Sequence, residues 1–80
     1  MATYMLCHRH TAKECPVAFA AWSGFDSPLR HTATLGSCVT GGHSLWWEVE
    51  AADACAALSF LPPFVARRTE ALPVRPVEIS

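Results

Sequence analysis

Apolar and polar side chains alternate along two clear stretches of the chain, as they do in a β-strand with one buried face. The first stretch runs from Thr3 to Arg9, and the second, which is the most regular, runs from His43 to Glu50. The first predicted strand places on one face Tyr4, Leu6, His8 and His10. The second places on one face His43, Leu45, Trp47 and Val49.

Two further strands and a turn complete the predicted sheet. Residues 31–39 form a strand that the Thr40-Gly41-Gly42 turn joins to the strand beginning at His43. Residues 72–79 are extended, and their two prolines restrict them to the edge of a sheet, because proline donates no hydrogen bond to a neighbouring strand.

Two short helices lie between these strands. Proline is tolerated at the first position of a helix but not inside it, so we expect Cys15 at the N-cap and a helix from Pro16 that ends near Gly24. Asp53 is a favourable N-cap for the second helix. Pro62-Pro63 interrupts that helix, and one more turn is expected over residues 64–68.

The predicted order is strand, helix, strand, strand, helix, strand over a single domain of residues 1–80. That order is typical of an α+β, ferredoxin-like βαββαβ fold, with an antiparallel sheet and two helices on one face. In such a sheet the first and third strands are neighbours. The end of the first strand, with His8 and His10, should therefore lie beside His43.

Composition narrows the classes of protein. Eighty residues support only one marginal core. Six basic against seven acidic residues give no electrostatic footprint for nucleic acid. No apolar run reaches the ~20 residues of a membrane span, and the first residues do not form a signal peptide. We therefore expect a cytoplasmic protein with reduced cysteines, for which a disulfide framework is the weaker interpretation.

The candidate chemistry lies at the end of the first strand. Imidazole and thiolate ligands suit zinc, copper and nickel, and a cysteine at a helix N-terminus favours the thiolate. The sequence thus predicts a transition-metal-binding protein with one cluster of ligands, namely His8, His10, Cys15 and His43. The simpler interpretation is that both strand-end histidines are solvated and that Cys15 only caps a helix.

Two other functions stay open. One is a small metal-free enzyme, isomerase- or cyclase-like, in which a histidine acts as general acid or base on a small-molecule ligand. Its apolar pocket would be lined by Phe19, Trp22, Trp47 and Phe60, although core packing explains these aromatics better. The other is an interaction module without chemistry of its own.

The remaining candidates are assigned to packing or solvent. Free cysteine is among the most buried residue types, so Cys7, Cys38 and Cys55 are expected in the core. His31 and the Arg67-Arg68 pair are expected in solvent. Trp46 falls on the face of the sheet opposite the core, and a large aromatic there predicts a homodimer that covers this face.

The runs His8-Arg9-His10 with Cys15-Pro16, and Gly42 to Ala51 (GHSLWWEVEA), resemble small actinobacterial proteins of the dimeric α+β barrel type. They are more distantly similar to a nickel-binding ferredoxin-like family. The resemblance implies a homodimer and, from the nickel-binding relatives, ligands at His8 and His10. The added Cys7 and Cys15 depart from that pattern and make copper or zinc as plausible as nickel. The same barrel type also hosts monooxygenases and lactone isomerases.

Overall fold

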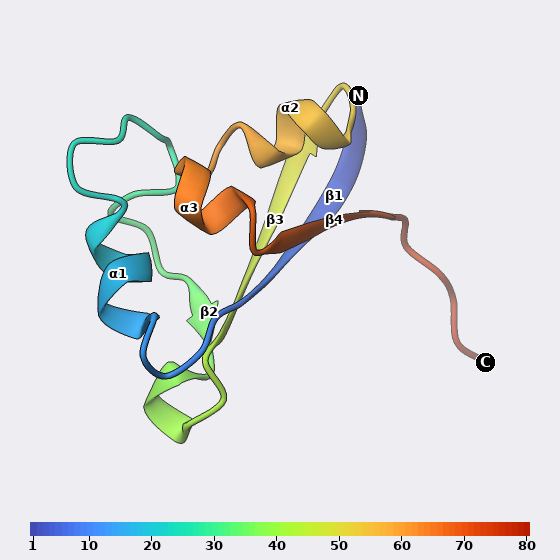
Figure 1. Cartoon of the computed structure of the whole chain (residues 1–80). Coiled ribbons are helices and arrows are strands. Elements are labelled where there is room, and N and C mark those ends of the chain that lie inside the picture. The colour runs from blue at the N-terminus through green and yellow to red at the C-terminus, as the bar shows by residue number, and fades with distance from the viewer.

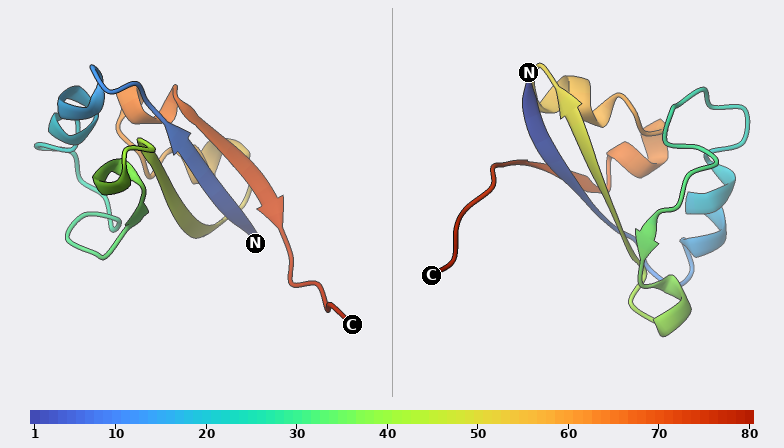
Figure 2. Two further views of the ribbon diagram at one scale, coloured as in Figure 1. Left: turned by 90° about the horizontal axis from the view of Figure 1, so that it is seen from below. Right: turned by 180° about the vertical axis from the view of Figure 1, so that it is seen from behind.

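The protein is a four-stranded sheet with short helices on one side, as a computed structural model of all 80 residues describes it (Figure 1). The elements are, in chain order, β1 (Ala2–Arg9), α1 (Cys15–Ala20), β2 (Leu35–Gly36), the 3-10 helix η1 (Cys38–Thr40), β3 (Ser44–Ala51), α2 (Ala54–Leu58), α3 (Pro63–Ala66) and β4 (Thr69–Val74). Residues 75–80 extend away from the body, on the side opposite the helices (Figure 2).

The sheet has the order β2-β3-β1-β4, and every neighbouring pair is antiparallel. The predicted adjacency of the first and third strands is confirmed, with Leu6 opposite Trp47 and Arg9 opposite Ser44. The predicted alternation is also confirmed, because Trp46, Glu48 and Glu50 are exposed whereas the apolar residues between them are buried.

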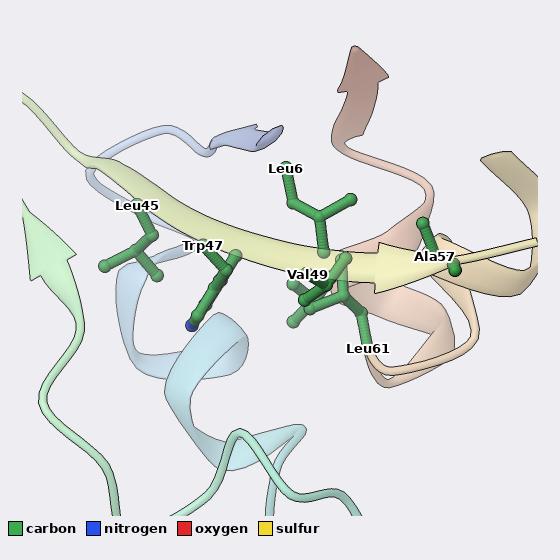
Figure 3. Packing of buried hydrophobic residues seen from close by; sticks show 8 residues of the cluster. Leu6, Leu45, Trp47, Val49, Ala57 and Leu61 are labelled. Atoms are coloured by element: carbon green, nitrogen blue, oxygen red, sulfur yellow. The ribbon is translucent and has the colours of Figure 1, made fainter. Parts of the chain in front are cut away.

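The core lies between the sheet and the helices (Figure 3). Its buried side chains are Leu6, Leu45, Trp47, Val49, Ala51, Ala57, Leu61 and Val65. Only 13 of the 80 residues are buried, so each large core side chain supplies a sizeable share of the stability, at about 1.5–3 kcal/mol each. Alternation in β1 and β3 supplies the sheet half of this core, and the segment from α2 to α3 supplies the rest.

The α+β class and the antiparallel sheet are as expected, but the simple βαββαβ order and the dimeric barrel are not. A 3-10 helix separates β2 from β3, two short helices separate β3 from β4, and the sheet is open. The strand expected over residues 31–39 is reduced to Leu35–Gly36. It ends there because Ser37 turns the chain into η1: its carbonyl accepts from the Gly42 amide at 2.7 Å.

Helix boundaries follow the prolines and the capping side chains. Asp53 caps α2 as predicted, since its carboxylate accepts from the Ala56 amide at 2.8 Å. Pro62-Pro63 splits the second helical segment into α2 and α3. The expected Cys15 N-cap is displaced by one residue: Glu14 is the N-cap and Cys15 opens the helix.

The last strand also differs from its expected range. It spans Thr69–Val74 instead of residues 72–79, and it occupies the edge next to β1 as its prolines require. None of the helices has the length and apolar character that crossing a bilayer demands.

Candidate metal centre

Four side chains with metal-ligating atoms meet where β1 ends and β3 begins. His10, Cys15, Cys38 and His43 each offer one ligand atom, and these atoms all lie within 4.8 Å of one another. They come from separate parts of the chain: the residue after β1, the start of α1, the start of η1 and the residue before β3. Imidazole nitrogens and cysteine sulfurs are ligands for zinc and other transition metals. This group could hold a metal ion.

The two histidines are placed by the pairing of β1 with β3. The ladder ends at Arg9 and Ser44, and the His10 amide continues it by donating to the His43 carbonyl at 3.1 Å. The two imidazole rings lie 5.6 Å apart between centroids. The prediction that His43 lies within side-chain reach of the first strand is therefore confirmed, with His10 as its neighbour.

Cys15 is positioned by a hydrogen-bonded turn just before α1. The Thr11 amide donates to the Glu14 carboxylate at 2.9 Å, and the Glu14 amide donates to the Thr11 hydroxyl at 3.3 Å. This reciprocal pair has the pattern of a capping box, but it closes the turn that precedes the helix, whose N-cap is Glu14. Pro16 is compatible with it because the helix begins only at Cys15, which leaves the proline in the first turn.

An ion pair anchors the same turn to the end of α3. The Arg68 guanidinium donates to Glu14 through Nε at 2.9 Å and Nη2 at 2.8 Å, and it stacks on the Phe64 ring at 3.7 Å. The Thr11 amide first, and then Arg68, lower the pKa of Glu14. Arg68, expected in solvent, keeps 30% of its side chain exposed, but its guanidinium also bridges two elements.

Cys38 reaches the group from the connection between β2 and β3. Gly41 closes η1 with φ of 88°, a left-handed conformation that glycine adopts without strain. The Cys38 sulfur lies 3.6 Å from His10 Nε2. Burial, and next the neighbouring Cys15, raise the pKa of the Cys38 thiol. Both thiol protons have to leave before the sulfurs can act as thiolate ligands.

His8 lies outside the group of four but orients His10. Its Nδ1 is 3.2 Å from the Val65 carbonyl and 3.0 Å from the Thr69 hydroxyl, which itself donates to that carbonyl at 2.7 Å. A carbonyl only accepts, so Nδ1 carries the hydrogen and Nε2 of neutral His8 is an acceptor. His10 Nδ1 lies 2.9 Å from this acceptor and donates to it.

The chain of bonds leaves Nε2 of His10 without a hydrogen, as an acceptor for the Cys38 thiol. Metal-binding histidines usually donate their other ring N–H to an acceptor in this way, which fixes the tautomer and the ring plane. Burial lowers the pKa of His8, as does the neighbouring His10. Burial also lowers the pKa of His10, followed by the effect of His43. Both pKa shifts favour the neutral imidazole rings that this chain of hydrogen bonds requires.

His43 shows two features that the protein alone does not explain. It is one of two residues other than glycine with positive φ, at 53°, a conformation that costs about 1–2 kcal/mol. Its Nδ1 is buried and has no hydrogen-bond partner. A buried unpaired nitrogen also carries a desolvation cost of about 1–3 kcal/mol. A bound cation at this nitrogen would offset both costs.

The structure thus brings together three of the predicted ligands, His10, Cys15 and His43, and adds Cys38. The fourth predicted ligand, His8, is hydrogen-bonded to His10 instead. Cys38 packs against the edge of the core, as expected of it, but its sulfur faces the site. The expectation that Cys55 is in the core is wrong, since it is exposed, and so is that for Cys7, which is half-buried beside Trp46 on the opposite face of the sheet. A signal for Cys38 was present: it and His43 flank the same turn, five positions apart.

A pocket of about 400 Å³ lies beside the group and shares Cys38 with it. Phe19, Trp22 and Trp47 line it as predicted, but Phe60 does not. Of the four histidines only His31 reaches the pocket, and His31 is exposed, as expected.

The fold and the site together define a small α+β protein with a cluster of two histidines and two cysteines. Searches of family models, curated proteins and solved structures find nothing that matches this chain.

Proposed function

We propose that this protein binds one transition-metal ion through His10, Cys15, Cys38 and His43. The observation that carries the proposal is the convergence of four ligand atoms within 4.8 Å from distant parts of the chain. Two further observations support it: the buried Nδ1 of His43 lacks a partner, and the His8–His10 bond leaves Nε2 of His10 as an acceptor that faces Cys38 at the site.

Zinc fits this ligand set best among the metals expected from the sequence. Two sulfurs and two imidazole nitrogens form the tetrahedral set typical of zinc, with bonds of about 2.0–2.3 Å. In such a tetrahedron the ligand atoms lie roughly 3.3–3.8 Å apart. The 3.6 Å separation of Cys38 Sγ and His10 Nε2 already falls in that range. The longest separations, at most 4.8 Å, need an inward movement of about 1 Å.

A set of four protein ligands favours a structural role, because catalytic zinc sites keep one position open for water or substrate. The ion would join the end of β1, the start of α1 and the β2–β3 connection. A chain with so few buried residues gains most from such a link. Nickel and copper are the other metals that the sequence predicts, and the experiment decides whether either of them binds instead of zinc.

The test is metal analysis of untagged protein, followed by titration of the metal-free protein with Zn²⁺ and Co²⁺. We expect one equivalent of metal per chain, and for cobalt the visible spectrum of a tetrahedral site with thiolate charge-transfer bands. Cys15→Ser and Cys38→Ser should each weaken these bands. Cys55→Ser, at an exposed position away from the site, is the matched control. If zinc, copper, nickel and cobalt all fail to bind the wild-type chain, the proposal is wrong.

The metal-free enzyme is the second candidate, and the aromatic pocket favours it. It has weaker support, because His8 and His10 bond to each other and, with His43, lie outside the pocket lining. The resemblance to dimeric α+β barrel proteins also stays a proposal. Within it, the similarity to a nickel-binding family would place ligands at His8 and His10, of which only His10 belongs to the group of four.

A further inference from the structure

The aromatic pocket has the character of a binding site for a small molecule. Ligand pockets typically enclose about 300–1,000 Å³ and combine apolar walls with a few polar groups. This one, at about 400 Å³, has the capacity for a ligand of one or two rings. The loop between α1 and β2 forms one side of it, and Leu45 and Trp47 of β3 form the other.

The walls are suited to a flat apolar group. The Trp22 and Trp47 rings lie 5.7 Å apart between centroids and are tilted by 50°. Trp47 is held in place by its indole N–H, which donates to the Thr34 hydroxyl at 3.3 Å. Trp22 is supported from behind by an edge-on contact with Phe25. Fixed aromatic faces of this kind bind planar rings by stacking and by burial of apolar area.

The charge at the pocket has one sign. Arg30 lines it, and none of the seven acidic residues does. Its guanidinium makes one hydrogen bond, from Nη1 to the Phe25 carbonyl at 3.2 Å, and it has no ion pair. A guanidinium has five N–H donors, so most of them are left for a ligand. A half-buried arginine with free donors is suited to hold a carboxylate through two parallel bonds.

We propose that this pocket binds a small planar aromatic carboxylate, with its ring against Trp22 and Trp47 and its carboxylate on Arg30. The proposal does not depend on metal binding, because Cys38 is the only group that the pocket shares with the metal cluster. A ligand of about eleven heavy atoms would bind with a dissociation constant on the order of 0.1–1 mM.

The test is titration of ¹⁵N-labelled full-length protein with cinnamate and, as its uncharged counterpart, cinnamyl alcohol. The three tryptophan side-chain N–H signals report the location directly. Those of Trp22 and Trp47 should shift and saturate, whereas Trp46 points to the opposite face of the sheet and serves as the internal control. The cinnamate concentration needed for saturation should be at least tenfold lower than that of the alcohol.

Two arginine variants separate the charge from the apolar walls. Arg30→Gln should weaken cinnamate binding about tenfold and leave the alcohol unchanged. Arg67→Gln removes the same charge at an exposed position and should change neither. The spectra also verify that each variant is folded. If Trp22 and Trp47 do not shift, if Trp46 shifts with them, or if Arg30→Gln has no selective effect, the proposal is overturned. Titrations of metal-free and zinc-loaded protein keep this result separate from the outcome for the metal site.

Discussion

At the scale of single residues, His8 and His10 have different roles: His10 belongs to the group of candidate ligands, and His8 orients it. In a strand, His8 and His10 face the same way, so the sequence gives them equal claims to a metal. The folded chain separates them, because Val65 and Thr69 occupy Nδ1 of His8 and His10 occupies its Nε2. Val65 and Thr69 lie 57 and 61 positions from His8 in the sequence, so no local pattern reveals these partners.

The first prediction concerns this division of roles. His8→Ala removes the acceptor that fixes the His10 ring, and metal affinity should fall about 10–100-fold, as for other residues that orient ligands. The cobalt spectrum at saturation should stay that of the wild type, because the four ligands remain. His31→Ala, at an exposed position, is the control. A changed ligand field in the His8 variant would instead identify His8 as a ligand and contradict the assigned role.

The second prediction uses the cysteines as reporters. Zinc should protect Cys15 and Cys38 from iodoacetamide, since a metal-bound thiolate is a poor nucleophile and both sulfurs face the cluster. Exposed Cys55 should react at the same rate with and without zinc. Peptide mass spectrometry after brief alkylation measures each site separately. Equal labelling of Cys15 and Cys38 under both conditions would count against them as ligands.

The third prediction is the pH dependence of the metal-free protein. The pKa values of His8 and His10 are lowered in the folded state, mainly by burial, so the unfolded chain takes up protons first as the pH falls. Stability should therefore be greatest above about pH 6.5 and should decrease below it. Urea unfolding between pH 8 and pH 5.5 measures this. The slope should become shallower in His8→Phe; a constant midpoint for the wild type would contradict the argument.

At the scale of the elements, the alternation of β1 and β3 predicted their faces, and the expected adjacency of the first and third strands predicted the meeting of His10 with His43. The connection between β2 and β3 was not predictable in the same way. Residues 31–39 contain several strand formers, but η1 replaces the end of the strand that they predict. Ser37 holds the turn closed, because its carbonyl and its hydroxyl accept hydrogen bonds from backbone amides beyond η1. That replacement directs Cys38 to the site, and local strand propensity contains no information about it.

The fourth prediction tests η1 as the element that places Cys38. Gly41 and Gly24 both have positive φ, and a side chain would meet open space at each. Alanine should therefore cost about 1 kcal/mol of stability at either position through backbone strain alone. Gly41→Ala should in addition weaken zinc binding, up to about fivefold, because the metal-free turn can relax away from the site. Gly24→Ala is the matched control; equal zinc affinities would show that η1 does not place the ligand.

At the scale of the whole molecule, one face of the sheet carries the core and the helices, and the other carries a different pattern (Figures 1 and 2). Register pairs place Cys7 beside Trp46 and Met5 beside Leu72 on that second face. Trp46 and Leu72 are 38% and 39% exposed. Carboxylates of Glu48 and Glu50 border these apolar side chains.

The last prediction is that this face associates with a second copy of the chain. A large aromatic and its apolar neighbours on an uncovered sheet favour burial against a partner, and a self-complementary patch gives a twofold dimer. We expect a dimer by light scattering at micromolar concentration. Trp46→Glu should yield a monomer, because it would place an unpaired charge in the interface. Val39→Glu introduces the same charge at a fully exposed apolar position on η1 and should leave the dimer intact. A wild-type monomer, or equal effects of the two variants, would mean that the face is free in solution and that Trp46 tolerates water.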